Sequence, residues 1–291
     1  MKPLYMWAGG KTKMMKNYLP YLPYKFSTYI EPFFGGGSMF IWAYQTQPDA
    51  SFVINDINPS LINIYQVIKT DCDKFIEEMD RLQAAYLPLD KDARKEYYYN
   101  LRHQHAYDYG GWSKTQEAAT LYFLMRTGFN GVWQINQNTN HRFGTPCGLL
   151  NQTDSVYDKE NVLEWHQALQ RTTILCGDFT GVDAYVDEGS FVFIDPPYRD
   201  SFTQYGVDFN DGEQIRVLDV MHNWAKRRSN VWLTNRNAGD GFWEREAQDK
   251  RGFKIHQFPV TYTAGRRKRT ENGFEAKSAT EVLIAQLGIG S

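Results

Sequence analysis

The run Asp195-Pro196-Pro197-Tyr198 places an acid, two prolines and an aromatic ring in direct succession. The exocyclic amine of adenine or cytosine is a poor nucleophile, because its lone pair is delocalised into the ring. A carboxylate and a carbonyl that accept the two amine hydrogens would favour a pyramidal, more nucleophilic nitrogen. An aromatic face stacked on the base would hold it there. We therefore interpret the Asp195 carboxylate, the Pro196 carbonyl and the Tyr198 ring as candidate catalytic groups.

A buried strand must deliver this run to its site. Residues 191–194 are four consecutive apolar residues of mostly aromatic and branched types, which predict a strand buried on both faces. Pro196 biases Asp195 toward an extended conformation, and neither proline can extend a ladder. We therefore expect the chemistry at the carboxyl end of a strand, where open α/β sheets bind ligands. The alternative is a rigid turn with Asp195 as a cap.

Two earlier segments predict a nucleotide-binding unit. Residues 27–47 are interpreted as a strand, a turn at residues 33–37 with three glycines, and an apolar helix, the opening of a βαβ unit. Residues 51–56 are interpreted as a second strand ending on Asp56, about 20 residues past the glycines, where such folds place a carboxylate on ribose hydroxyls. A helix is expected over 60–69. The glycines do not form GxGxxG, so a pyrophosphate is not required, and an N-cap role for Asp56 is the alternative.

The segment at residues 7–11, Trp-Ala-Gly-Gly-Lys, is a weaker signal of the same kind. Paired glycines before Lys11 predict a close approach of backbone to a ligand with a cation at hand. The match is too short for a phosphate-binding loop, which needs GxxxxGK[ST].

Residues 71–170 differ in character from both flanks. Apolar positions recur at helical spacing over 73–86 and 117–126, and strands do not alternate with helices there. We therefore predict an α/β catalytic domain made of residues 1–70 and 171–291, with residues 71–170 inserted as a mainly helical domain.

A long loop of the inserted domain has the composition of a nucleic-acid contact. Residues 126–148 combine amide side chains, arginines and aromatics on glycine joints, which suit base-edge contacts and wedging into a duplex. An ordinary surface loop is the alternative, but the length favours function. Gln134 and Arg142 are candidate DNA-binding residues in this loop.

The C-terminal part returns to an α/β pattern. We expect a strand at 172–176, a helix at 212–228, a strand at 230–235, and an antiparallel pair at 255–263 and 280–286. Between the last two lies a basic, glycine-bearing segment, 264–278, which we expect to be mobile. Its Arg266 and Arg267 are predicted to contact DNA phosphates.

The composition excludes several classes of protein. The 291 residues are 42% hydrophobic with a net charge of −2, so the chain is globular and is not a generally basic nucleic-acid coat. No apolar run is long enough to span a bilayer. Three scattered cysteines and six histidines show no disulfide or metal spacing, so we expect a reduced, cytoplasmic protein without a metal.

Taken together, these motifs resemble the Dam-type, D12-class DNA adenine-N6 methyltransferases. Each motif is short, but their joint occurrence in this order is highly specific, and the resemblance covers nearly the whole chain. The motifs are Trp-Ala-Gly-Gly-Lys at 7–11, Glu-Pro-Phe-Phe-Gly-Gly-Gly-Ser at 31–38, Asn-Asp-Ile-Asn at 55–58, the loop at 128–136, Phe-Gly-Thr-Pro at 143–146 and Asp-Pro-Pro-Tyr at 195–198.

The resemblance implies a Rossmann-like methyltransferase sheet with an inserted target-recognition domain. It implies S-adenosylmethionine as methyl donor, no metal, and an adenine flipped from duplex DNA onto Tyr198. It also implies a site-specific enzyme, of a kind found in restriction–modification, and Phe129 and Asn130 match positions that the family uses for wedging and pairing. We expect a protein of a bacterial or phage-infected cell that is a monomer in solution. The cofactor-binding residues by match to the family's motifs are Trp7, Lys11, Phe33, Gly35, Asp56 and Asp195.

Two positions depart from the family members that read GATC. Those members usually carry Arg where this chain has Gln134, and often Lys where it has Met6. Glutamine prefers adenine, whereas arginine prefers guanine, so we expect recognition that differs from strict GATC or is looser. A cytosine-N4 or RNA amino-methyltransferase, and an inactive DNA-binding module, are the alternatives. A nucleotide oxidoreductase is disfavoured by the missing GxGxxG.

Overall fold

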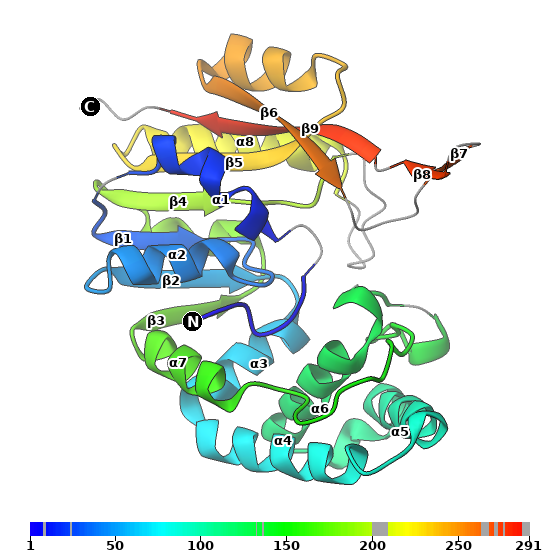
Figure 1. The fold of residues 1–291 in the computed structure, drawn as a ribbon. Helices are drawn as coiled ribbons and strands as arrows, with labels where there is room; N and C mark the ends of the chain where they lie inside the picture. The colour runs from blue at the N-terminus through cyan, green and yellow to red at the C-terminus, as the bar shows by residue number, and fades with distance from the viewer. Residues whose placement is uncertain are drawn as a thin grey trace.

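The computed structural model describes residues 1–7, 10–23, 25–131, 133–135, 137–199, 209–262, 268–270, 273–275 and 277–286. Its main feature is a seven-stranded sheet in the order β3-β2-β1-β4-β5-β9-β6 (Figure 1). The strands are β1 Thr28–Glu31, β2 Ser51–Asp56, β3 Thr172–Cys176, β4 Ser190–Ile194, β5 Asn230–Asn237, β6 Lys254–Tyr262 and β9 Lys277–Ala285.

The sheet is mixed. Strands β1 to β5 run parallel, whereas β9 pairs antiparallel with both β5 and β6. The expected α/β class is confirmed, and so are the strands expected at 172–176, 191–194 and 51–56 and the antiparallel pair at the C-terminus.

Alternate residues of the central strand β4 face two separate cores. Phe191 and Phe193 pack into one core with α2 (Ser38–Thr46) and α7 (Lys159–Gln170). Val192 and Ile194 pack into the other with α8 (Asp211–Ala225). Figure 1 shows α2 and α8 on opposite faces of the sheet. A strand with apolar residues on both faces is the fully buried type that the sequence predicts.

The inserted helices share the first of these cores. The chain leaves the sheet through α3 (Pro59–Thr70) and forms α4 (Cys72–Tyr86), α5 (Lys91–His103) and α6 (Lys114–Thr127). A capping box of Ser113 and Gln116 starts α6, which is buried along most of its length. The helices expected at 73–86 and 117–126 are confirmed, whereas α5 was not expected, because only Tyr98 and Leu101 of its residues are buried.

Helix α7 packs with the sheet. Its Trp165 lies against Phe34 and Phe40, and the indole N–H donates to the Lys2 carbonyl at 2.8 Å. These contacts assign α7 to the catalytic domain and so favour an inserted domain that ends before α7. The division of the chain at residue 170 stays a prediction.

The basic segment 264–278 contains a short antiparallel pair, β7 (Lys268–Thr270) with β8 (Gly273–Glu275). Arg266 and Arg267 lie outside the described residues, so their phosphate contacts stay a prediction.

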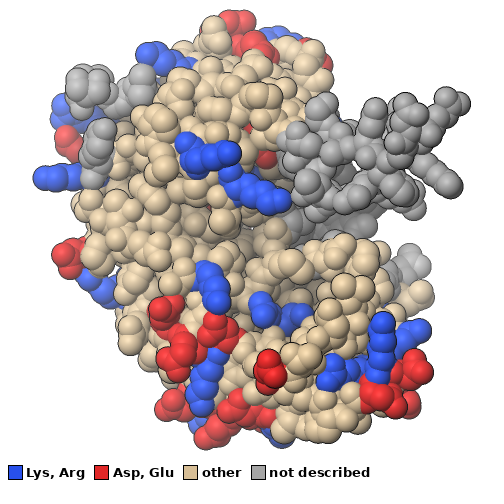
Figure 2. Space-filling view, viewed as in Figure 1, with Lys and Arg blue, Asp and Glu red and all other residues tan. Residues whose placement is uncertain are grey.

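None of the described helices combines the length and apolar character that a bilayer-spanning segment needs. Figure 2 shows a hollow on one face between the sheet and the inserted helices, with acidic side chains gathered over the helical part.

The turn before α2 depends on Gly37. This residue is the N-cap of α2 with φ +66°, and a Cβ there would lie 2.7 Å from Phe34 and 2.9 Å from Trp165. We expect Gly37→Ala to lower the free energy of unfolding by about 1–3 kcal/mol, because both rings must shift. Urea denaturation measures the free energy of unfolding of the wild type and the variant. Gly110→Ala, with no atom within 4 Å of its new Cβ, is the matched control. Equal stability of both variants would contradict the expectation.

Candidate active site

The predicted site residues meet at the carboxyl ends of neighbouring strands. Asp56 ends β2, the glycine turn follows β1, and Asp195 follows β4. Since β1 lies between β2 and β4 in the sheet, the turn separates the two acids. The fold therefore brings together segments that lie far apart in the sequence, as open α/β sheets do at this edge.

Asp195 forms a buried ion pair with Lys11. The lysine Nζ lies 2.7 Å from Oδ1 and 2.8 Å from Oδ2, and the lysine is only 2% exposed. Thr234 of β5 donates its hydroxyl to Oδ1 at 3.0 Å. A short 3₁₀ turn, Lys11–Lys13, carries the lysine into this position.

Burial raises the pKa of Asp195, and the ammonium of Lys11 counteracts this rise. Burial alone would lower the pKa of Lys11, but the charges of Asp195 and Glu281 outweigh it and raise this pKa above its ordinary value. Lys11 is therefore an ammonium, and it favours the ionised, hydrogen-bond-accepting form of Asp195.

The Tyr198 hydroxyl joins the same network. It accepts a hydrogen bond from Lys11 Nζ at 3.1 Å and donates one to Glu281 Oε1 at 2.8 Å. The Lys11 ammonium also lies 4.9 Å from the ring centroid, within cation–π range. The ring that we expect to stack on a base is thus fixed at its polar end.

Buried amides hold the turn between Asp195 and Tyr198. The Pro197 carbonyl accepts from Gln214 Nε2 at 2.8 Å. Asn235 Oδ1 accepts the backbone N–H of Arg199 at 3.2 Å, and both amide residues are fully buried. The guanidinium of Arg199 pairs with Asp211 and Asp240. The motif is therefore anchored on both sides, and Pro196 is buried between its neighbours.

Asp56 holds the glycine turn. Its Oδ2 accepts the Gly35 N–H at 2.9 Å, and its Oδ1 accepts the Asn58 N–H at 3.0 Å, while burial raises its pKa against these bonds. Tyr65 donates to the Gly35 carbonyl at 2.9 Å. A carboxylate offers about four lone-pair sites. The backbone N–H of Ile57 also bonds this carboxylate, and the acceptor position that remains could accept a hydroxyl group of a ligand.

Trp7 explains why the turn needs glycine. A Cβ on Gly35 would lie 2.5 Å from Trp7 Nε1, and one on Gly36 would lie 2.8 Å from Trp7 Cβ. The indole therefore packs closely against this turn, and the predicted contact of Gly35 with a cofactor stays a prediction. Ala8 and Gly9 of the same motif lie outside the described residues.

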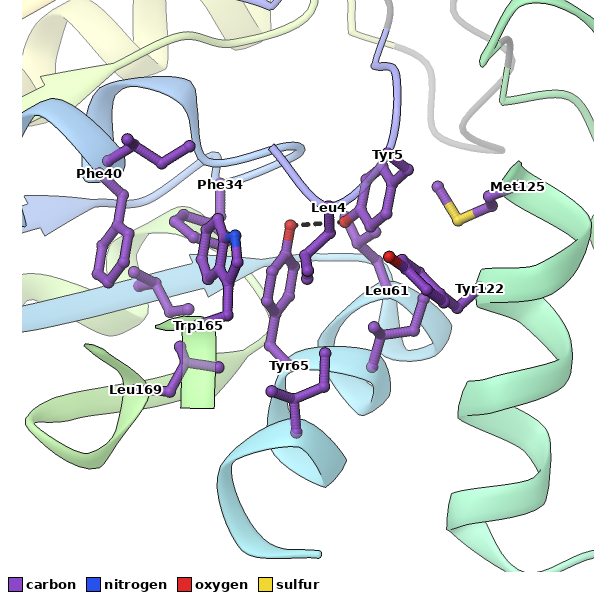
Figure 3. Close-up of a cluster of buried hydrophobic side chains, with 14 of the residues drawn as sticks. Leu4, Tyr5, Phe34, Phe40, Leu61, Tyr65, Tyr122, Met125, Trp165 and Leu169 are labelled. Atoms are coloured by element: carbon purple, nitrogen blue, oxygen red, sulfur yellow. Dashed lines mark hydrogen bonds between the residues drawn. The ribbon is translucent and has the colours of Figure 1, made fainter. Parts of the chain in front are cut away.

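An aromatic cluster supports the turn and ties the inserted helices to it. Figure 3 shows Tyr5 between Tyr65 of α3 and Tyr122 of α6, with Phe34 and Trp165 on the far side of Tyr65. The hydroxyls of Tyr5 and Tyr65 lie 2.6 Å apart. The position of the inserted domain is therefore linked through packed rings to the turn beside Asp56.

Two isolated β-bridges hold together the two sides of the loop that contains the candidate DNA contacts. Isolated bridges join Gly128 to Cys147 and Ile135 to Phe143. At the base of the loop, directly after the Gly128 bridge, Phe129 is 47% exposed and Asn130 has φ +50°.

Its inner part faces the active site. Trp133 is buried with its ring 5.9 Å from that of Trp7, and Gln134 beside it is half-buried.

Arg142 is held inside the inserted domain. Its guanidinium forms an ion pair with Glu117, lies 3.3 Å from His105 Nε2 and stacks 3.7 Å from the centroid of Tyr109. These contacts connect the loop to α6 and to the segment after α5. Contact of Arg142 with DNA stays a prediction.

Several residues of the site were not picked out from the sequence. They are Tyr18, Phe179, Gln214, Thr234, Asn235 and Glu281. Phe33, predicted as a cofactor contact, stacks on Phe179 at 5.2 Å. A signal was available for Thr234 and Asn235, which are polar residues at the carboxyl end of a buried strand. Glu281 carried a second such signal, because it is an acid within an otherwise apolar strand.

The described residues contain no group of three or more His, Cys, Asp or Glu side chains that could hold a metal ion. The expectation of a metal-free site stays a prediction.

Comparisons with known proteins agree with the geometry. A family described as D12 class N6 adenine-specific DNA methyltransferase matches residues 7–258. The chain is 36% identical to a type II methyltransferase, M.MjaIII, of Methanocaldococcus jannaschii, over 81% of this chain and 84% of the relative. It is 31% identical to M.CviBI of Paramecium bursaria Chlorella virus NC1A (88% and 93%). It is 29% identical to a DNA adenine methylase of Haemophilus influenzae (78% and 76%).

The His105–Arg142 contact makes stability depend on pH. Burial, followed by the charge of Arg142, lowers the pKa of His105 from 6.5 to about 3. Below pH 6.5 the unfolded chain binds a proton that the folded chain refuses, so folding loses stability as the pH falls. Relative to His105→Gln, the wild type should lose about 2 kcal/mol between pH 7 and pH 5, as measured by urea denaturation. His103→Gln, which removes an exposed histidine nearby, is the control. Equal losses in wild type and His105→Gln would contradict this assignment.

Proposed function

The chain belongs to the D12 class of N6 adenine-specific DNA methyltransferases, and we propose that it methylates adenine with S-adenosylmethionine at the site around Asp195. The observation that carries the proposal is that Lys11 bonds both the Asp195 carboxylate and the Tyr198 hydroxyl, at the same sheet edge as the glycine turn that Asp56 holds. Asp195 and the Pro196 carbonyl accept the two hydrogens of the adenine amine. The Tyr198 ring stacks on the flipped base.

The residues around the glycine turn fit the cofactor. The remaining acceptor position of Asp56 suits a ribose hydroxyl, and the stacked rings of Phe33 and Phe179 offer an apolar wall for a purine. Trp7, Lys11 and Gly35 lie toward Asp195 and would border the methionine end. When bound, S-adenosylmethionine supplies the methyl group on its sulfonium. The chain's own residues contribute orientation, exclusion of water and hydrogen bonds to the amine.

DNA contacts are proposed for the loop and for the basic segment. The exposed ring of Phe129 suits a wedge between bases, and Asn130 beside it can bond the edge of an unpaired base. Gln134 would read a base, Arg142 would contact DNA or support the loop, and Arg266 and Arg267 would bind phosphates. We also propose that the enzyme acts as a monomer in the cytoplasm, where Cys72, Cys147 and Cys176 stay thiols.

The function is tested by single-molecule sequencing of DNA incubated with the protein and S-adenosylmethionine. N6-methyladenine at one short motif is expected, and it should be absent with Asp195→Ala. Modified cytosine would favour the cytosine-N4 alternative. An unmodified DNA despite cofactor binding would point to an RNA acceptor or to an inactive DNA-binding module.

Cofactor use has its own measurement. S-adenosylmethionine at about 100 times its dissociation constant should stabilise the fold by about 2.7 kcal/mol, whereas NAD should not. Asp56→Asn should weaken this stabilisation, because an amide accepts fewer hydrogen bonds than a carboxylate. A thermal shift with NAD but none with S-adenosylmethionine would contradict the cofactor assignment.

Base recognition by Gln134 is tested by substitution. Replacing it with arginine should move the preferred base at one position of the site toward guanine, by about 1–3 kcal/mol of discrimination. Sequencing of methylated DNA libraries measures the shift. Complete and exclusive GATC methylation by the wild type would reject the hypothesis that Gln134 alters recognition.

A further inference from the structure

Glu281 is a buried carboxylate that the motifs do not explain. It lies on β9, paired with Arg236 of β5 and Phe258 of β6, and is 3% exposed. It stands outside residues 7–258, which the family matches. A carboxylate in such a position is costly unless hydrogen bonds satisfy it.

Its two oxygens have different partners. Oε2 accepts the hydroxyl of Tyr18, a fully buried residue of α1 (Met15–Tyr18), at 3.1 Å. Oε1 accepts the hydroxyl of Tyr198 at 2.8 Å. The carboxylate thus bridges the N-terminal segment that carries Lys11 and the turn that carries the stacking ring.

The Tyr198 hydroxyl is directed by this pair of neighbours. It accepts from the Lys11 ammonium at 3.1 Å and donates to Glu281, so its donor and one acceptor position are both assigned. A bond to a charged acceptor is stronger than one between neutral groups and sets the direction of the phenol. The amides of Gln214 and Asn235 hold the backbone of the turn on which this ring stands.

We propose that Glu281, held by Tyr18, is a positioning residue for methyl transfer: it fixes the Tyr198 ring on which the flipped adenine stacks. This inference rests on the proposed function. A ring free to turn about its side-chain bonds would offer the adenine several orientations, and only one brings the amine to Asp195. Glu281 therefore acts through Tyr198 and touches neither base nor cofactor.

The test is a double-mutant cycle of Glu281→Gln and Tyr198→Phe in the full chain. We measure single-turnover methylation at saturating DNA and S-adenosylmethionine. Glu281→Gln should lower the rate by about tenfold, the value of one hydrogen bond to a charged group. In the Tyr198→Phe background, which lacks the hydroxyl, the same change should cost little. Cofactor affinity should stay as in the wild type.

A second readout follows the base itself. With 2-aminopurine in place of the target adenine, stacking on Tyr198 should quench the fluorescence of the flipped base. Glu281→Gln should weaken this quenching. Glu246→Gln is the matched control, because Glu246 is a buried carboxylate that bonds Lys250 away from the site. It should change neither the rate nor the quenching.

The outcomes separate the possibilities. A wild-type rate in Glu281→Gln, or the same fold loss in both backgrounds, would overturn the positioning role. If Glu281→Gln does not fold, Tyr18→Phe keeps the test open, since it releases one carboxylate oxygen and should lower the rate only when the Tyr198 hydroxyl is present. A wild-type protein that methylates no adenine would instead reject the proposed function.

Discussion

The buried ion pair between Lys11 and Asp195 is the constraint on which the site depends. Removing two charges from water is costly, and their attraction offsets this cost only with good geometry and further hydrogen bonds. Both are present: Nζ lies within 2.8 Å of both carboxylate oxygens, and Thr234 bonds one of them. The ammonium lowers the pKa of Asp195 against the rise that burial causes. A protonated carboxyl there would be a weaker acceptor for the amine hydrogen that Asp195 receives.

The sheet topology supplies the partners of this pair. Parallel strands bring Asp56, the glycine turn and Asp195 to one edge, and the reversed strand β9 adds Glu281 from the C-terminal part of the chain. The inserted helices join the same edge through the Tyr5, Tyr65 and Tyr122 rings. DNA recognition and methyl transfer therefore share one packed support. The loop with Trp133 meets Trp7 directly above the glycine turn.

The sequence predicts the parts of this arrangement that are local. Apolar runs predicted the strands that end at Asp56 and before Asp195. The order of the short motifs along the chain predicted the family. Contacts between distant segments could not be predicted from the sequence. Lys11 and Asp195 are 184 positions apart, and no periodic pattern in the sequence indicates that they meet. Helix α5 was not predicted because only its Tyr98 and Leu101 are buried, so its sequence shows no clear apolar repeat at helical spacing. The contact of Trp7 with Gly35 could not be predicted, since only packing shows which side chain approaches a glycine.

The dependence of methylation rate on pH tests the ion pair most directly. Lys11 lowers the pKa of Asp195 against burial, so Lys11→Met should raise this pKa further. Single-turnover methylation should then lose rate at a higher pH in Lys11→Met than in the wild type, with Lys13→Met, an exposed neighbour, as the control. A rate reduced equally at every pH, with the acid limb unmoved, would contradict the claim that Lys11 lowers the pKa of Asp195.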